Sequence, residues 1–252
     1  MPSQQDTPVF TYHTRVSVTP EQDQMLRAYA ILFGHVERTL FTDIEKGKHA
    51  KDLKSAYLAR FGITARQFNA LRIQLLGKIQ AIRKQIPLQI ENLKTKIKKA
   101  KKTIVELVQS IPGSNQLHQK RRRLANLQER LERLEADQKT DRVHICFGSK
   151  RLFRAQYYLD ENGFASHAEW HEAWTEARSR QFFVIGSKDE TAGCQGCVAV
   201  PEENGSYSLR LRLPSQASAR HLFIHWGSLC VWTRAVRGIV GLRSSLVLSF
   251  PA

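Results

Sequence analysis

The chain has 252 residues, with 39 Lys and Arg against 23 Asp and Glu, so its formal net charge is +16 at pH 7. Hydrophobic residues make up 42% of the chain, which excludes a wholly disordered protein. No run of about 18 apolar residues occurs and the N-terminus lacks the pattern of a signal peptide, so we expect no transmembrane helix and a cytoplasmic location. Four cysteines do not make a disulfide scaffold. The excess of cations favours an acidic partner such as nucleic acid.

Most of the excess charge lies in one segment. Between residues 78 and 134 there are 15 Lys or Arg and only 4 acidic residues, a net charge of +11 in 57 residues. The other 195 residues carry a net charge of only +5. This segment is therefore the first candidate for contact with a polyanion.

The first part of the chain predicts a strand followed by three helices. Residues 8–18 alternate between apolar and polar side chains, which is typical of a half-buried strand. Thr19 precedes a proline and has a glutamine three residues later, so we expect a capped helix over 20–44. A second helix is expected over about 50–61, and the same capping pattern starts a third after Thr64.

The basic segment predicts a pair of helices. An apolar ladder over residues 79–107 advances mostly by alternating steps of three and four, which is typical of a coiled-coil seam. Pro87 lies within it, and because proline removes an amide donor we expect the helix to kink or restart there. A turn signal at 111–115 leads into a second apolar ladder over 117–134. We therefore predict an antiparallel coiled-coil hairpin over 88–138.

The outer face of this predicted hairpin is strongly basic. A face that met only water would carry charges of both signs, whereas so many like charges repel one another unless an anion relieves them. The alternative is a solvated coiled coil that binds a protein partner. We predict that seven side chains contact phosphate: Lys98, Lys99, Lys101, Lys102, Arg121, Arg122 and Arg123.

Two later segments add further candidate contacts. Segment 150–154 combines three cations with an aromatic ring, which suits phosphate contact with stacking, although a helix start with solvated side chains would look the same. Segment 207–213 alternates, with apolar side chains facing inward and two arginines, with Ser208, facing outward; these arginines either contact a phosphate backbone or lie on a solvated face. The candidate contacts here are Lys150, Arg151, Arg154, Arg210 and Arg212.

The remaining elements after residue 141 are predicted from short patterns. Residues 142–147 and 182–185 are apolar runs that favour strands. Ser166, with a glutamate three residues later, predicts the start of a helix. Trp170 and Trp174 lie four residues apart on one face of that helix, and we interpret them as core residues.

A metal site is an alternative that the cysteines suggest. Cys194 and Cys197 form a CxxC pair, and His144 with Cys146 would complete a set of four zinc ligands. No second CxxC pair, phosphate-binding loop, nucleophile elbow or identifiable carboxylate cluster accompanies them. We therefore predict no catalytic residue, no metal and no cofactor, and keep a zinc-binding enzyme as the less favoured alternative.

Residues 147–197 resemble the N-terminal half of the TnpB-related proteins of insertion sequences, which are often described as transposases and are similar to the ancestors of type V CRISPR effectors. The matching features are Phe147-Gly148-Ser149, the aromatic-rich helix around Trp170 and Trp174, and residues 186–191. The resemblance covers roughly residues 8–214. It implies a discontinuous wedge-like β-barrel of residues 8–19 and 141–214, interrupted by a helical recognition lobe of residues 20–140. Together these parts would hold a guide RNA and a target DNA.

The chain departs from this family pattern in two places. The family has Asn-Gln after the position of Gly193, whereas Cys194 stands before the glutamine here, which weakens a family-based zinc site. A RuvC-like nuclease follows in the family, whereas residues 222–252 hold three arginines, no lysine and no acidic residue. We therefore expect residues 215–252 to be an atypical tail produced by a frameshift, with a genuine basic tail as the alternative.

These observations predict an α+β protein with a small wedge-type β-barrel or sheet and an inserted helical lobe. The predicted function is nucleic-acid binding, to guide RNA or DNA, by the truncated recognition half of a TnpB-like RNA-guided nuclease. We expect no cleavage by this chain, no membrane partner and a location at the nucleoid. The rival predictions are a coiled-coil module for protein interaction and the zinc-binding enzyme.

Overall fold

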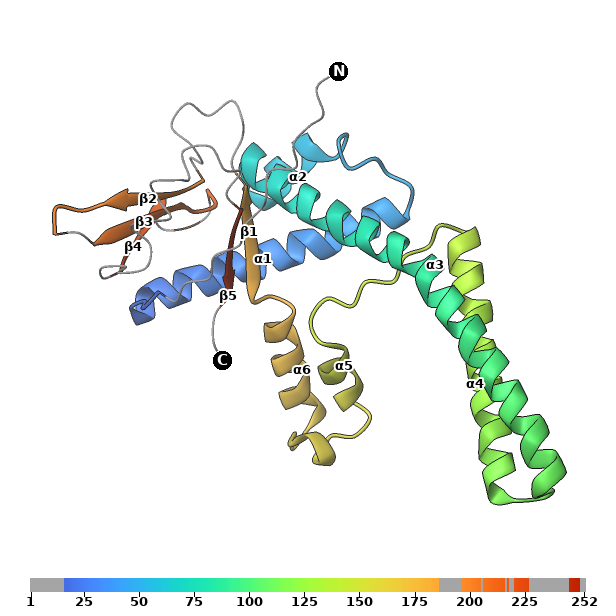
Figure 1. The fold of residues 1–252 in the computed structure, drawn as a ribbon. Coiled ribbons are helices and arrows are strands. Elements are labelled where there is room, and N and C mark those ends of the chain that lie inside the picture. Colours follow the sequence, from blue (N-terminus) through green and yellow to red (C-terminus); the bar gives the residue numbers. More distant parts are fainter. Residues whose placement is uncertain are drawn as a thin grey trace.

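The computed structural model describes residues 16–185, 196–204, 206–215, 217, 220–226 and 245–249. The fold is α+β, with helices first and strands last along the chain (Figure 1). The elements are α1 (Pro20–Glu45), α2 (Lys54–Phe61), α3 (Ala65–Ser110), α4 (Asn115–Lys139), α5 (Lys150–Ala155), a 3₁₀ turn (Asp160–Asn162), α6 (His167–Ala177), β1 (Gln181–Ile185), β2 (Cys197–Pro201), β3 (Tyr207–Arg212), β4 (His221–Trp226) and β5 (Ser245–Ser249).

The helices begin where the capping residues predict. At the start of α1, the Thr19 hydroxyl accepts from the Gln22 amide at 3.3 Å, and the Gln22 side chain accepts from the Thr19 amide at 2.8 Å. Thr64 and Gln67 form the same reciprocal pair at the start of α3. Each pair satisfies two amide donors that the first turn of a helix leaves unbonded. The predictions for α1 and for the start of α3 are confirmed.

The main core lies where α1, α3 and the strands meet. Phe68 and Leu71 of α3 are fully buried there, and so is Leu211 of β3. The ring of Tyr29 on α1 stacks on that of Phe182 on β1, with 4.4 Å between the ring centroids. Burial of aromatic rings of this size contributes much of the stability of a small core. Figure 1 shows β1 lying across α1 at this junction.

The strands form two antiparallel sheets. β1 pairs with β5, and β2, β3 and β4 form a three-stranded sheet in which β3 is central. Neither sheet closes into a barrel within the residues that the structure describes. β4 lies within residues 215–252, the segment that the sequence predicts to be an atypical tail. Its Leu222 and Ile224 are nevertheless buried in the main core. The rest of that segment lies mostly outside the described residues, as do residues 8–15 and 186–195.

Two predictions about extended segments are wrong. Residues 142–147 form a connection and not a strand, because none of the described strands pairs with them, and their apolar side chains pack on the main core. Ser208 on β3, which was predicted to face solvent, is buried, although the alternation of the strand places it on the same face as the exposed Arg210 and Arg212. Its hydroxyl hydrogen-bonds the Glu202 carboxylate, so this small polar side chain is satisfied when it leaves water.

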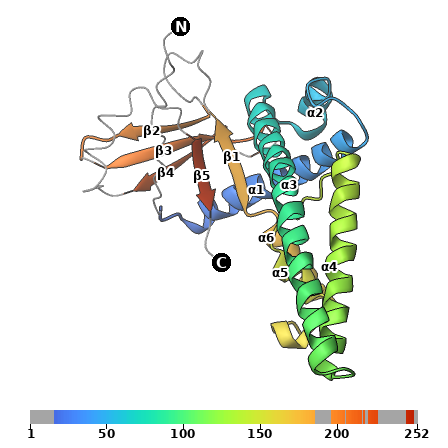
Figure 2. The ribbon, with the colours of Figure 1, turned by 45° about the vertical axis from the view of Figure 1, so that its right-hand side comes forward.

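The long helix α3 joins the core to a projecting helical pair. It continues through Pro87 without interruption, so the predicted restart is wrong, and Figure 1 shows its axis changing direction midway. Beyond this point α3 and α4 lie side by side and antiparallel, joined by a short turn, and extend away from the core (Figure 2). Ile90, Leu93 and Ile97 of α3 are buried in the seam between them. Lys94 forms an ion pair with Glu135 across it at 2.7 Å.

We predict that Asp43 gives the α1–α2 junction an acid-sensitive stability. Its carboxylate accepts from Lys48 at 2.8 Å and from the Tyr57 hydroxyl at 2.6 Å, and these hydrogen bonds lower the pKa of Asp43. A carboxyl group with a lowered pKa stabilises the fold above its unfolded pKa, about 3.9, and loses that contribution as the pH falls through its folded pKa. We expect Asp43→Asn to lower the unfolding free energy by about 1–2 kcal/mol at neutral pH.

Urea unfolding of both proteins at neutral pH and at about pH 3 tests this prediction. The difference in unfolding free energy between the unaltered protein and Asp43→Asn should be smaller in acid than at neutral pH. A difference that stays constant would show that the ionised carboxylate contributes nothing.

Candidate nucleic-acid interface

The charge excess of the helical pair is concentrated near its tip. We call residues 95–128 the distal hairpin; they hold nine Lys or Arg and a single acidic residue, Glu106. Residues 129–139, nearer the core, hold four acidic and three basic residues. The structure therefore separates a balanced base from a strongly basic tip.

The seven cations predicted on this hairpin all have exposed side chains. Lys102 lies 4.0 Å from Glu106, and the other six form no ion pair within the part of the chain that the structure describes. Lys98 and Lys102 are one turn apart on α3, and a like-charge pair at this spacing destabilises a helix by about 0.2–0.5 kcal/mol. These side chains are exposed, six of the seven form no ion pair among the described residues, and all are therefore accessible to an external anion.

The lysines of α3 and the arginines of α4 lie close along the hairpin axis. The ion pair between Lys94 and Glu135 shows which residues of α3 and α4 lie at the same height along the hairpin axis. On this register Lys102 is level with residue 127, and Arg123 is four residues nearer the tip, which corresponds to roughly 6 Å. The two clusters therefore occupy neighbouring levels of one projecting element.

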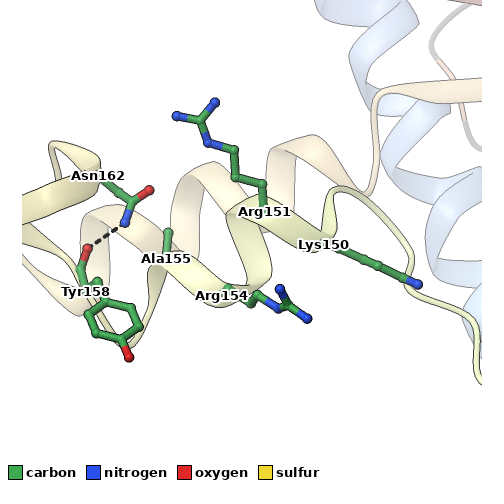
Figure 3. Close-up of a pocket in the computed structure, with 6 residues that line it drawn as sticks. All are labelled: Lys150, Arg151, Arg154, Ala155, Tyr158 and Asn162. Carbon is green, nitrogen blue, oxygen red and sulfur yellow. Dashed lines mark hydrogen bonds between the residues drawn. The ribbon is translucent and has the colours of Figure 1, made fainter. Parts of the chain in front are cut away.

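A second group of predicted contacts meets at α5. Lys150, Arg151 and Arg154 line a pocket of about 330 Å³ together with Tyr158 and Asn162. In the view of Figure 3, Lys150, Arg154 and Tyr158 extend toward one side of α5, and Arg151 extends toward the other. The structure thus brings the three cations of this segment together around one hollow.

The motif Phe147-Gly148-Ser149 holds the start of α5 in place. The Phe147 ring packs edge-on against Phe41 of α1 with 5.7 Å between the centroids. Gly148 has φ of +100°, and a Cβ there would lie 3.1 Å from the Trp174 ring. The Ser149 hydroxyl caps α5 by accepting from the Leu152 amide at 3.3 Å. Each residue of the motif therefore has a structural role beside the pocket.

Two tryptophans of α6 pack against α5. The rings of Trp170 and Trp174 are stacked, with 6.3 Å between their centroids and an interplanar angle of 9°. Trp170 donates from Nε1 to the carbonyl of Leu152 at 2.7 Å, and the Phe153 ring packs on Trp174. The interpretation of these tryptophans as core residues is confirmed, since both are buried.

The two arginines of β3 form a third patch. Arg210 and Arg212 are exposed, as predicted. Arg210 lies opposite the half-exposed Phe223 on β4, and Arg212 lines a pocket of about 580 Å³ with Arg220 among its neighbours. The sheet that carries them and the tip of the hairpin lie at opposite ends of the molecule in Figure 1. The predicted contacts therefore do not form one continuous site.

Sequence reasoning missed a pair of arginines at the junction of α1 and α6. The half-buried Arg38 donates to the carbonyl of Arg178 at 3.2 Å. Burial, and then the charge of Arg178, lower the pKa of Arg38. The Arg178 Nε is buried without a partner among the described residues. The two residues are 140 positions apart, so no local pattern could have revealed them.

The residues of the zinc alternative do not converge in the described structure. Cys146 packs beside the tryptophans of α6, whereas Cys197 packs on the main core, and Cys194 lies outside the described residues. The exposed His144 lies 3.2 Å from Asp137. Among the residues that the structure places, no three His, Cys, Asp or Glu side chains are grouped to hold a metal ion. None of the described helices combines the length and the apolar character needed to cross a membrane.

We predict that Gly148→Ala loosens the support of the pocket. Both a positive φ and contact with the Trp174 ring oppose a side chain there. The variant should lose about 2–3 kcal/mol of stability in the α5–α6 unit, seen as a lower midpoint when the near-ultraviolet circular dichroism of the stacked tryptophans is followed on heating. Gly47→Ala is the matched control, because Gly47 has φ of +83° but open space around it, and should cost only about 1 kcal/mol. Equal effects of the two substitutions would contradict the proposed contact with Trp174.

Comparisons with protein-family models, with curated proteins and with solved structures each found no match to this chain.

Proposed function

We propose that this chain binds nucleic acid and that the distal hairpin is its main surface for phosphate. The observation that carries the proposal is the exposure of eight of the nine cations of the distal hairpin, beside one acidic residue, on a helical pair that projects from the core. Such a surface attracts a polyanion over a distance and gains free energy by releasing the counterions of the nucleic acid. Because these contacts are to phosphate, they supply affinity and not the choice of sequence.

The resemblance of residues 147–197 to TnpB-related proteins supports a more specific form of the proposal. In this form the chain acts as the recognition half of a TnpB-like RNA-guided nuclease and holds guide RNA and DNA without cleaving them. The hairpin would pack as a coiled coil within the recognition lobe, and the strands would belong to a wedge-like barrel. The roles of Phe147, Gly148 and Ser149 in placing α5 are consistent with a motif kept for positioning a binding surface.

A protein-binding hairpin is the second candidate, and one observation favours it. Val105, Val108 and Ile111 near the tip expose 57%, 42% and 50% of their surface, which is unusual for apolar residues that have no partner. A partner that covered these side chains would bind through apolar contact. The two candidates therefore differ in their response to salt, because phosphate contact weakens with salt far more than apolar contact does.

We predict that neutralising Lys98, Lys99, Lys101 and Lys102 together, each to Gln, reduces the salt dependence of binding. For duplex DNA the slope of log K against log salt is about −0.9 per neutralised phosphate, so the slope should become shallower by up to about 4. Affinity at low salt should fall with it. Fluorescence anisotropy with labelled DNA and RNA over a salt series measures both quantities.

The matched control neutralises four lysines that are also exposed but lie outside the distal hairpin: Lys46, Lys51, Lys84 and Lys139. This control should keep most of the affinity and the slope. If both variants lost the same slope, the basicity of the whole chain and not the hairpin would drive binding. If the hairpin variant kept the full affinity and slope, the proposal would be wrong.

A further inference from the structure

Tyr158 presents an aromatic ring to solvent at the cationic pocket of α5. Its side chain is 60% exposed, whereas Trp170 and Trp174 of the same unit are buried and stacked on each other. Phe153, the aromatic ring in segment 150–154, packs on Trp174 and does not line the pocket, although it is 43% exposed. The residue in this segment with an available ring at the pocket is therefore Tyr158.

The backbone that carries Tyr158 is held in a fixed turn. The Tyr158 amide donates to the Ala155 carbonyl at 3.0 Å, which closes the turn after α5. The Asn162 side chain donates from Nδ2 to the Tyr158 carbonyl at 2.7 Å (Figure 3). Ala155 is itself buried against the tryptophans. The ring is therefore exposed on a fixed base, so little conformational freedom would be lost when a ligand stacks on it.

Two cations share the side of α5 on which this ring lies. Lys150, Arg154 and Tyr158 follow at intervals of four residues, and in Figure 3 they extend toward the same side. One helical turn, or about 6 Å along the axis, separates Lys150 from Arg154 on α5, and Tyr158 follows in the turn after the helix. No carboxylate lines the pocket, although Asp160 and Glu161 follow in the next turn. The three side chains therefore present two positive groups, those of Lys150 and Arg154, followed by the flat ring of Tyr158.

This order of groups fits one unit of a single strand. A phosphate needs a cation, and an unpaired base gains free energy by stacking on an aromatic ring. A base inside a duplex has both faces covered by its neighbours, so it cannot use the ring. We infer that the α5 pocket binds an unpaired nucleotide of single-stranded nucleic acid, with Lys150 and Arg154 on the phosphates and Tyr158 on the base.

The inference rests on the proposed function and adds a ligand class to it. The distal hairpin offers cations to any phosphate backbone, single or double. The α5 pocket distinguishes single strands from duplexes, because only its ring requires an uncovered base. The two surfaces can therefore be tested separately.

The test compares three RNA probes of equal length: a single-stranded oligouridylate, a blunt duplex and a single strand that lacks its bases. Tyr158→Leu should weaken binding of the oligouridylate by about tenfold and leave the duplex and the base-free strand unchanged. Tyr158→Phe keeps the ring and should keep the affinity. Lys150→Gln combined with Arg154→Gln should weaken binding of both single strands, with or without bases.

Tyr157→Leu is the matched control, because Tyr157 is 69% exposed but does not line the pocket. It should leave all three affinities close to those of the unaltered chain. Equal losses for Tyr157→Leu and Tyr158→Leu, or a loss with Tyr158→Phe as large as with Tyr158→Leu, would overturn the inference. So would a Tyr158→Leu effect of the same size on the base-free strand. Repeating the series in the variant with four neutralised hairpin lysines tests the two proposals separately. If the distal hairpin does not bind phosphate but the α5 pocket does bind a nucleotide, the effect of Tyr158→Leu on the oligouridylate should be unchanged in that variant.

Discussion

The stability of the projecting pair of helices α3 and α4 depends on the balance between the burial of its apolar seam and the repulsion among its like charges. Near the core, Ile90, Leu93 and Ile97 are buried between α3 and α4, and the acidic residues of α4 offset its cations. Toward the tip most seam residues are only half-buried, with the buried Leu117 as an exception, and nearly all charges are positive. Cohesion is therefore weakest where repulsion is greatest. A polyanion at the tip would remove that repulsion and so stabilise the fold by linkage while it binds.

Local rules of helix capping and periodicity predicted the helical part of the fold well. Thr19 and Thr64 begin their helices through reciprocal bonds, and Ser166 begins α6, because each capping residue acts within three positions of its partner. The apolar ladder of α3 predicted several of its buried residues, among them Ile90, Leu93 and Ile97. Of the two outcomes predicted at Pro87, a kink or a restart, the restart does not occur, because the loss of one amide donor is small beside the seam and core contacts that hold α3 on either side.

The sheets and the small pocket depend on contacts between distant segments, which local patterns do not contain. Residues 142–147 have the composition of a strand, but whether a strand forms depends on a partner, and no strand in the described part of the chain pairs with them. Arg38 on α1 donates to the carbonyl of Arg178 at the end of α6, 140 residues later in the chain. Which aromatic ring contacts Trp174 and which lines the pocket also depends on the packing of α5 and α6, where Phe153 takes the first position and Tyr158 the second. The cations of the candidate sites could be predicted from composition, whereas the ring that gives one of them its specificity could not.

Chemical footprinting of lysines in the unaltered chain tests the central claim most directly, because no substitution disturbs the fold. Acetylation would be measured by mass spectrometry with and without bound RNA. We predict that RNA protects Lys98, Lys99 and Lys101 much more than Lys46 and Lys51, which are also exposed but lie outside the distal hairpin. Equal protection at all these positions, or none on the hairpin, would contradict the claim that the projecting helices contact the phosphates.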